Sequence, residues 1–172
     1  ARYARAISSF INGGLAAGLP QIEALIRERP DYPFFWEVKG DFLTRSGKMR
    51  EAIEPLRRAL KLAGDAPLIR IRLAQALLAL NEPSTLAEVA DLARRSLIED
   101  PTPEAWRLMA SIAYREEKRP QADLATAEAH FLEGDIKQAQ IFAKRAKAGL
   151  KNGESGWLRA NEIDTYKAPA GR

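Results

Sequence analysis

The sequence has 172 residues, 46% of them apolar, which is enough for one compact domain or one short array of repeats. It has no cysteine, which excludes disulfides and thiolate metal sites, and no stretch approaches the roughly 18 apolar residues of a membrane span. The net charge of +4 arises in residues 144–172, with 7 Lys/Arg against 3 Asp/Glu, whereas residues 1–143 hold 20 of each. Because a nucleic-acid binder more often carries a continuous basic stripe, we expect no nucleic-acid partner.

Helices are favoured over strands throughout the sequence. Alanine and leucine dominate the apolar residues, valine is rare, and no run alternates convincingly between apolar and polar side chains. The predicted fold class is therefore all-α. In chain order we predict about ten helices, with approximate spans 2–13, 18–29, 33–46, 49–63, 67–80, 85–99, 103–117, 120–133, 135–150 and 155–166.

Prolines mark a repeat of helix pairs. Pro33, Pro67 and Pro103 each begin a predicted helix, and they are separated by 34 and 36 residues. A period near 34 is that of the tetratricopeptide repeat, a pair of antiparallel helices. No pair buries its apolar face alone, so we predict four to five hairpins stacked into a right-handed α-solenoid over residues 1–166, with 167–172 as a tail.

The repeat from Pro33 to Ala66 resembles the tetratricopeptide consensus almost position for position. Gly40 and Ala52 are expected where the two helices cross, because only small side chains let the backbones approach. Gly47 is expected to permit the turn between the helices. The bulky residues expected beside the crossing are Trp36, Leu43 and Leu56.

The neighbouring repeats are less regular. The first is degenerate, and we expect its turn at Gly13-Gly14. Thr85 and Glu88 have the spacing of a capping box for the following helix. Thr102 is predicted to be the N-cap of the helix that begins at Pro103.

The repeat register becomes ambiguous after Pro120. Ala122 and Ala129 fit the second helix of one pair, but the positions of Gly134 and Ala139 make residues 120–133 look like a first helix. Both interpretations stay open, and a third is that this one helix serves both pairs.

No catalytic residue, metal site or cofactor site is predicted within this chain. His130 is the only histidine, so the two-histidine HExxH zinc motif is excluded, and we expect His130 to pack or to face solvent. The sequence also has no G-x-S-x-G, Walker or G-x-G-x-x-G motif. We therefore expect the chain to be no enzyme by itself.

A binding groove for protein or peptide is predicted on the first helices of the pairs, which line the concave surface in this architecture. The alternative is that these side chains are merely exposed or pack on a neighbouring domain. Their mixture of apolar and charged types suits a peptide with apolar anchors and charged rims. The predicted residues are Phe34, Glu37, Asp41, Arg45, Ile71, Gln75, Leu78, Arg107, Ser111 and Tyr114. A separate basic cluster, Lys144-Arg145 with Lys147, is a weaker candidate for contact with an anionic partner or membrane.

Two runs carry a more specific resemblance: RPDYPFFWEVKG (Arg29 to Gly40) and AEAHFLEGDIKQA (Ala127 to Ala139). With them, nearly the whole chain resembles the C-terminal repeat domain of bacterial periplasmic zinc metalloproteases of the β-barrel-assembly-enhancing type. No residue here matches that family's HExxH motif, so no zinc ligand is carried over.

The resemblance implies a periplasmic protein whose zinc-dependent protease domain precedes Ala1. It also implies that this domain recruits substrates or outer-membrane assembly proteins, or covers the protease's own active site. Since the sequence starts without methionine or signal peptide, we expect an excised or processed domain. The alternative is a stand-alone scaffold or adaptor in assembly or secretion.

Overall fold

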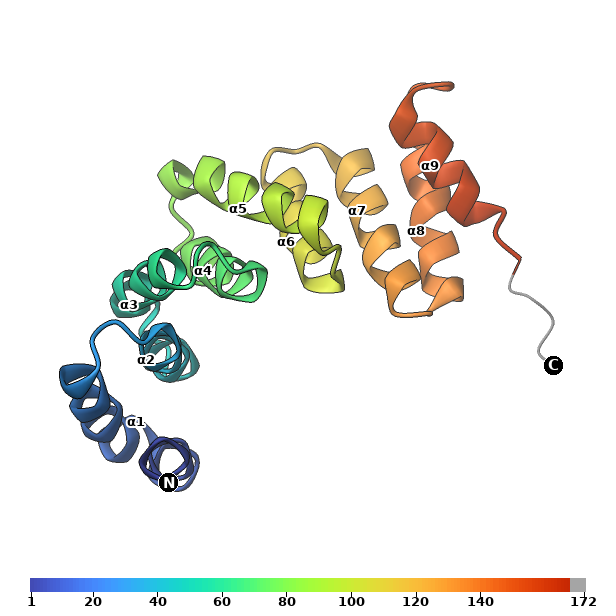
Figure 1. Ribbon diagram of the computed structural model, residues 1–172. Helices are drawn as coiled ribbons and strands as arrows, with labels where there is room; N and C mark the ends of the chain where they lie inside the picture. Colours follow the sequence, from blue (N-terminus) through green and yellow to red (C-terminus); the bar gives the residue numbers. More distant parts are fainter. Residues whose placement is uncertain (168–172) are drawn as a thin grey trace, which may run out of the picture. The chain divides into compact units, whose positions relative to one another are not determined.

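The computed structural model describes residues 1–167, and this part of the chain is helical with no β-strand. The predicted all-α class is therefore confirmed; of the predicted tail, residues 168–172 lie outside the described part. Figure 1 labels the helices, whose bounds are α1 (Arg2–Glu28), α2 (Pro33–Arg45), α3 (Met49–Leu62), α4 (Pro67–Ala79), the short 3₁₀ helix η1 (Pro83–Thr85), α5 (Leu86–Glu99), α6 (Pro103–Arg115), α7 (Arg119–Leu132), α8 (Ile136–Gly149) and α9 (Ser155–Asp164).

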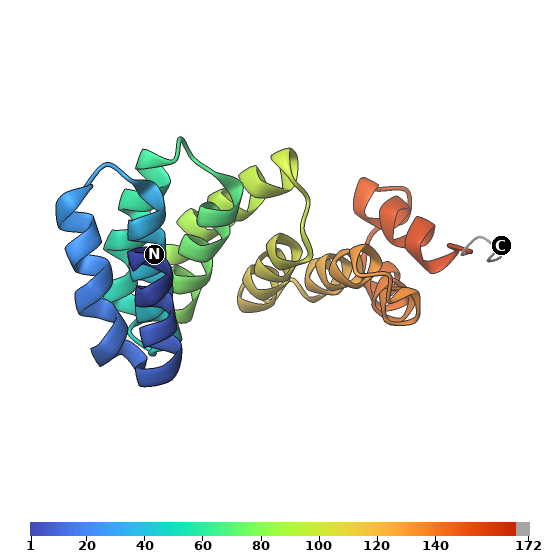
Figure 2. The same ribbon diagram turned by 60° about the horizontal axis from the view of Figure 1, so that its bottom comes forward.

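The chain divides into two compact units, Ala1–Leu92 and Ala93–Arg172, and the division falls within α5. In the first unit, α1 packs against α2, α2 against α3, and α3 against α4 (Figure 2). In the second unit, α7 packs against α6, α8 and α9.

Helix α1 consists of two segments that meet at Gly14. This residue has a φ of 67° and a ψ of −161°, which interrupts the helical backbone as the predicted Gly13-Gly14 turn requires. The two segments lie side by side as an antiparallel pair. Gln21 Nε2 of the second segment donates a hydrogen bond to Ser9 Oγ of the first, at 2.7 Å. Counting these segments separately, the ten predicted helices are all present among residues 1–167.

Two glycines let the helices of the first unit pack closely. A Cβ on Gly40 would lie 2.6 Å from Leu56 of α3, as predicted for the crossing of α2 and α3. A Cβ on Gly18 would lie 2.6 Å from Cβ of Phe10, whose ring stacks on that of Phe42 with centroids 4.1 Å apart. Glycine at each crossing therefore makes room for a bulky neighbour.

The second unit instead packs on alanines. Its core is formed by Ala127 of α7, Ala139 and Ala143 of α8, and Ile163 of α9, all fully buried. Alanine keeps the helix axes close and costs no side-chain entropy. One glycine contributes as well, because a Cβ on Gly149 of α8 would clash with Pro120 of α7. Arg159 of α9 also connects the helices, because it forms an ion pair with Glu128 of α7.

Four turns between helices share one hydrogen-bond pattern, in which an N–H donates to the carbonyl five residues earlier. Lys48 N donates to Leu43 O at 2.9 Å, Asp65 N to Leu60 O at 3.0 Å, Lys118 N to Ala113 O at 2.9 Å, and Asp135 N to His130 O at 3.0 Å. The residues before these donors, Gly47, Gly64, Glu117 and Gly134, have φ values of 76°, 64°, 60° and 79°. This is the helix C-terminal arrangement that favours glycine.

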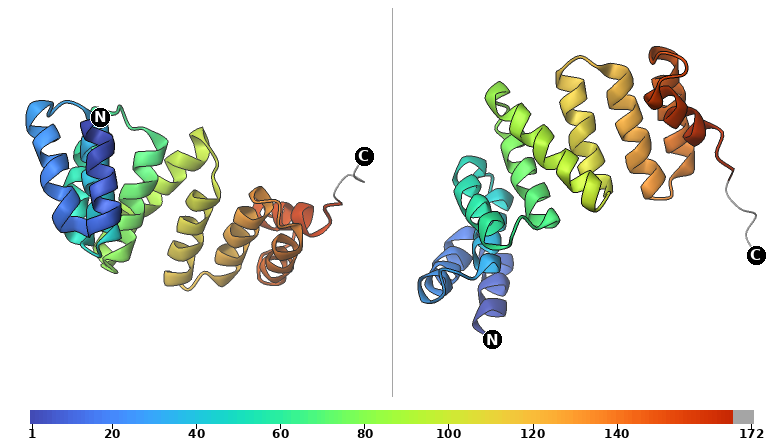
Figure 3. Two further views of the ribbon diagram at one scale, coloured as in Figure 1. Left: turned by 90° about the horizontal axis from the view of Figure 1, so that it is seen from below. Right: turned by 45° about the horizontal axis from the view of Figure 1, so that its top comes forward.

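The ambiguous register after Pro120 is explained by this pattern. The same turn joins α6 to α7 and α7 to α8, and α7 packs against both neighbours (Figure 3, right). Helix α7 is therefore the second helix of one hairpin and the first of the next. Both interpretations of the sequence describe part of the structure.

Of the two predicted helix caps, one is confirmed. Thr102 Oγ1 accepts a hydrogen bond from Ala105 N at 3.3 Å. The capping box at Thr85 is corrected: its Oγ1 donates to Leu77 O and Glu82 O, while the Glu88 carboxylate pairs with Arg57 at 2.8 Å. The reason is that the longer turn continues as η1, so Thr85, directly before α5, ends a 3₁₀ turn and its hydroxyl donates back into that turn.

Candidate functional site

The strongest candidate site lies on the first unit, where α2 and α4 pack side by side. Arg72 of α4 bridges two carboxylates of α2: its Nη1 lies 2.8 Å from Asp41 Oδ1, and its Nε lies 3.0 Å from Glu37 Oε1. Arg45 adds a longer contact of 3.7 Å to Asp41. Two carboxylates and two guanidinium groups thus form a charge-balanced network across the two helices.

Exposed apolar side chains flank this network. Phe34 precedes Glu37 by one helical turn on α2, and Leu68 precedes Arg72 by one turn on α4, so each shares a face with the charged residue. Phe34 is 48% exposed and Leu68 is 63% exposed. We call Phe34, Glu37, Asp41, Arg45, Leu68 and Arg72 the α2–α4 face.

Tyr3 extends this face onto α1. Its ring lies 5.8 Å from that of Phe35, and burial is the main cause that raises the pKa of its hydroxyl, followed by the charge of Glu37. The phenol is therefore near the acidic side of the network. Neither Tyr3 nor Arg72 was identified from the sequence, although Arg72 stands one helical turn after Leu68.

The predicted groove residues of α4 are only partly where we expected them. Gln75 is exposed and Leu78 is half-buried, but Ile71 is buried in the core and does not line a surface. The physical reason is that α4 is apolar on nearly all sides, so the spacing of its apolar residues does not identify the face that packs.

The remaining predicted residues belong to the second unit. Arg107 of α6 pairs with Glu133 after α7 and lies 3.8 Å from Glu104, and Ser111 Oγ donates to Arg107 O at 2.9 Å. Tyr114 is exposed, with the guanidinium of Arg119 5.2 Å from its ring centroid. On this surface of α6 the polar groups of Arg107 and Ser111 already have partners within the chain.

His130 packs against a neighbouring ring. Its imidazole stacks on Phe142 of α8 with centroids 5.6 Å apart, and its Nδ1 lies 3.8 Å from Glu133. Within residues 1–167 no group of three or more His, Cys, Asp or Glu side chains is placed to hold a metal ion. None of the helices described is both long and apolar enough to cross a membrane.

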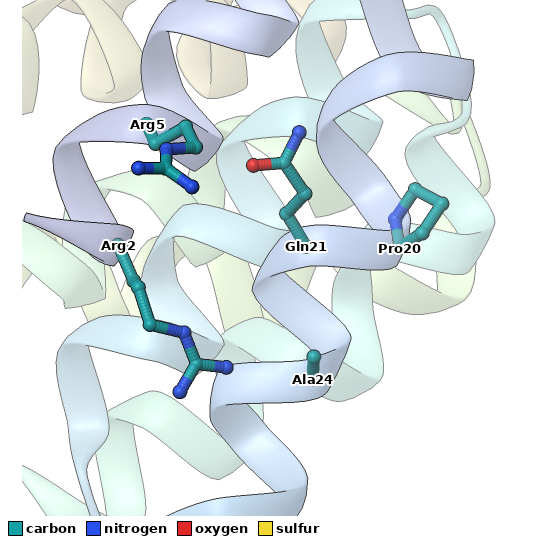
Figure 4. Close-up of a pocket in the computed structure, with 5 residues that line it drawn as sticks. All are labelled: Arg2, Arg5, Pro20, Gln21 and Ala24. Atoms are coloured by element: carbon teal, nitrogen blue, oxygen red, sulfur yellow. The ribbon is translucent and has the colours of Figure 1, made fainter.

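A shallow pocket of about 410 Å³ lies between the two segments of α1. Figure 4 shows Arg2 and Arg5 on the first segment and Pro20, Gln21 and Ala24 on the second. Arg2 forms a bidentate ion pair with Glu28, with two hydrogen bonds of 2.7 Å. These hydrogen bonds lower the pKa of Glu28. The pair joins the two ends of α1.

Comparison with known proteins identifies the fold. No family model and no curated protein sequence matches the chain. Among solved structures, it is similar to a chain of the structure described as Naa15/Naa10 bound to HypK-THB, with a TM-score of 0.50 and 18% sequence identity. The likeness covers 94% of this chain but 28% of that chain, the tetratricopeptide-like helical repeat Naa15. The chain is thus an all-α protein built from tetratricopeptide-like helical hairpins.

Proposed function

We propose that this chain is a non-catalytic protein- or peptide-binding repeat domain and that it binds its partner on the α2–α4 face. The observation that carries the proposal is the exposure of Phe34 and Leu68, each one helical turn before the charged residues of the Arg72 network. Exposed apolar side chains beside ordered charges are typical of interaction sites, where a few anchors supply most of the binding free energy.

The network suggests what kind of segment binds. Because Arg72 and Arg45 together balance the charges of Glu37 and Asp41, the face has little net charge and needs no counterion from the partner. An apolar side chain of the partner packs between Phe34 and Leu68, while its polar backbone meets the fixed charges. The similar solved structure supports this role in a general way, since it is a complex that includes HypK.

A finer proposal follows from the two sequence runs that resemble periplasmic metalloproteases. The chain would be the repeat domain of a zinc metalloprotease in the periplasm, with the zinc held by the rest of that protein. It would recruit substrates or outer-membrane assembly proteins, or cover the protease site. A stand-alone adaptor in assembly or secretion is the second candidate, because the α2–α4 face by itself supports both candidates equally.

The reading frame upstream of Ala1 separates these two candidates. An HExxH motif there supports the metalloprotease, and a frame without it supports the adaptor. Hydrolysis of casein by purified residues 1–172 with added zinc would contradict the proposal that this chain is non-catalytic.

The binding face is tested with peptides selected from a phage-displayed library on the intact chain. We expect the double variant Phe34→Ala/Leu68→Ala to bind the selected peptides about tenfold more weakly or worse, since anchor residues each contribute more than about 1 kcal/mol. Binding is measured by fluorescence anisotropy, and circular dichroism checks the fold.

A matched control is available because Leu158 and Ile11 are 49% and 64% exposed, as Phe34 and Leu68 are, but lie outside the α2–α4 face. The variant Ile11→Ala/Leu158→Ala should bind the same peptides as the unaltered chain does. If both double variants lose affinity equally, or neither does, the α2–α4 face is not the site.

A further inference from the structure

A second surface, on α8 of the second unit, combines exposed cations with an exposed apolar side chain. Lys137, Ile141 and Lys144 follow one another at intervals of four and three residues, so they share one face of the helix. All three side chains are exposed, Ile141 at nearly half of its surface. We call these three residues the α8 basic face.

This face borders a pocket. A depression of about 380 Å³ is lined by the α8 basic face together with Gln140 and with Asp164 of α9. Its polar wall is held in place, because Gln140 Nε2 donates to Asp164 O at 3.2 Å and to Tyr166 O at 2.9 Å. The pocket therefore has a fixed shape beside Ile141.

The acidic groups of the adjacent helix do not neutralise the α8 basic face. Asp164 pairs with Lys147 at 2.9 Å, and Glu162 pairs with Arg159 at 3.0 Å. The remaining carboxylate, Glu154 before α9, lies 3.7 Å from Lys151. Lys137 and Lys144 make no ion pair with any residue in the described part of the chain, so their charge is directed to solvent.

We infer that the α8 basic face binds an acidic protein segment that carries an apolar side chain. The carboxylates of the segment pair with Lys137 and Lys144, and its apolar side chain packs on Ile141 at the pocket. This surface is distinct from the α2–α4 face and belongs to the other unit.

A peptide fits this surface better than a membrane does. Membrane binding by a helix face needs a large apolar surface inserted among the headgroups, and here a single apolar side chain stands between two lysines. A pocket of fixed shape suits one side chain of a partner. Lys137 and Lys144 are two helical turns apart, so they match two carboxylates with the same spacing.

The test is fluorescence anisotropy of the full chain with a labelled peptide of alternating Glu and Leu residues. We expect salt-sensitive binding, because ion pairs at a surface are screened. A peptide with Gln in place of each Glu should bind at least tenfold more weakly. Lys137→Gln/Lys144→Gln should weaken binding about threefold to tenfold, as two surface ion pairs are lost. Ile141→Ser should also weaken it.

The matched control is Arg58→Gln/Lys61→Gln, which removes two exposed cations from α3 and changes the net charge equally. This variant should bind the Glu/Leu peptide as tightly as the unaltered chain does. Equal losses in the two double variants, or equal binding of the Gln peptide, would overturn the inference. Binding to vesicles of phosphatidylserine and phosphatidylcholine without binding to the peptide would overturn it in favour of a membrane.

Discussion

The two units build the same helical hairpin with different cores. In the first unit bulky rings fill the space, with Phe10 stacked on Phe42, and Gly18 makes room for both. In the second unit Ala139 and Ala143 of α8 are buried with Ala127 of α7, and a glycine of α8, Gly149, makes room for Pro120 of α7. The first unit therefore buries larger apolar side chains, and hydrophobic stabilisation follows the apolar area removed from water.

The second unit adds polar ties where its core is small. The carboxylate of Glu128 on α7 is buried and receives two hydrogen bonds from Arg159 of α9, at 2.6 Å and 2.8 Å. These bonds raise the pKa of Arg159. Lys147 of α8 similarly bonds Asn161 and Asp164 of α9. An alanine core with ion pairs and a core of stacked rings therefore both build the same helical hairpin.

The largest expected effect is that of removing an aromatic ring from the first unit. Phe42→Ala should lower the free energy of unfolding by about 4 kcal/mol, because it leaves a cavity beside Phe10 and Gly18. Hydrogen exchange of the backbone amides measures this unit by unit. We expect faster exchange in α1, α2 and α3.

The second unit serves as the internal control for Phe42→Ala. Its amides in α7 and α8 should exchange as in the unaltered chain if each core stabilises its own unit. Equally accelerated exchange throughout residues 1–167 would show that the two units unfold together. The two cores would then have no separate contributions to the free energy of unfolding.

The next effect tests the ion pair of the second unit. Arg159→Met should leave the Glu128 carboxylate buried without its partner and destabilise the protein by about 2 kcal/mol. This is less than a fully buried pair would cost, because the Arg159 side chain is 40% exposed. Thermal unfolding followed by circular dichroism measures the change.

The double variant Glu128→Met/Arg159→Met separates loss of the bond from burial of a lone charge. It should recover most of the stability lost in Arg159→Met, since no unpaired carboxylate remains. If the double variant is as unstable as the single one, packing by the Arg159 side chain, and not the charge, ties α9 to α7.

The sequence predicts the hairpins well because their determinants are local. Small residues at Gly40 and Ala52, with Gly47 between them, specify a crossing and a turn within one repeat. The same local signals appear around α7 in two overlapping frames, which is why its sequence fitted both helix positions. The turn at Glu117 was harder to find, because glutamate gives no sign of a positive φ.

The candidate site was less predictable because it depends on contacts between repeats. Arg72 stands 31 residues from Asp41, and only the stacking of α4 on α2 brings the two together. Ile71 was placed on the groove because the apolar pattern of α4 has no single face. Thus the residues of α2 were located by their repeat, whereas Arg72 of α4 required the structure.

The smallest effect compares the equivalent turns of the two units. Glu117 holds a φ of 60° where the first unit has Gly47 at 76°. We expect Glu117→Gly to stabilise the second unit by about 1 kcal/mol, because the left-handed conformation costs a residue with a Cβ about that much. Gly47→Ala should destabilise the first unit by a similar amount, and nothing lies within 4 Å of the added Cβ to obscure the effect. Chemical denaturation measures both changes, and equal signs for the two substitutions would mean that the turns are not equivalent.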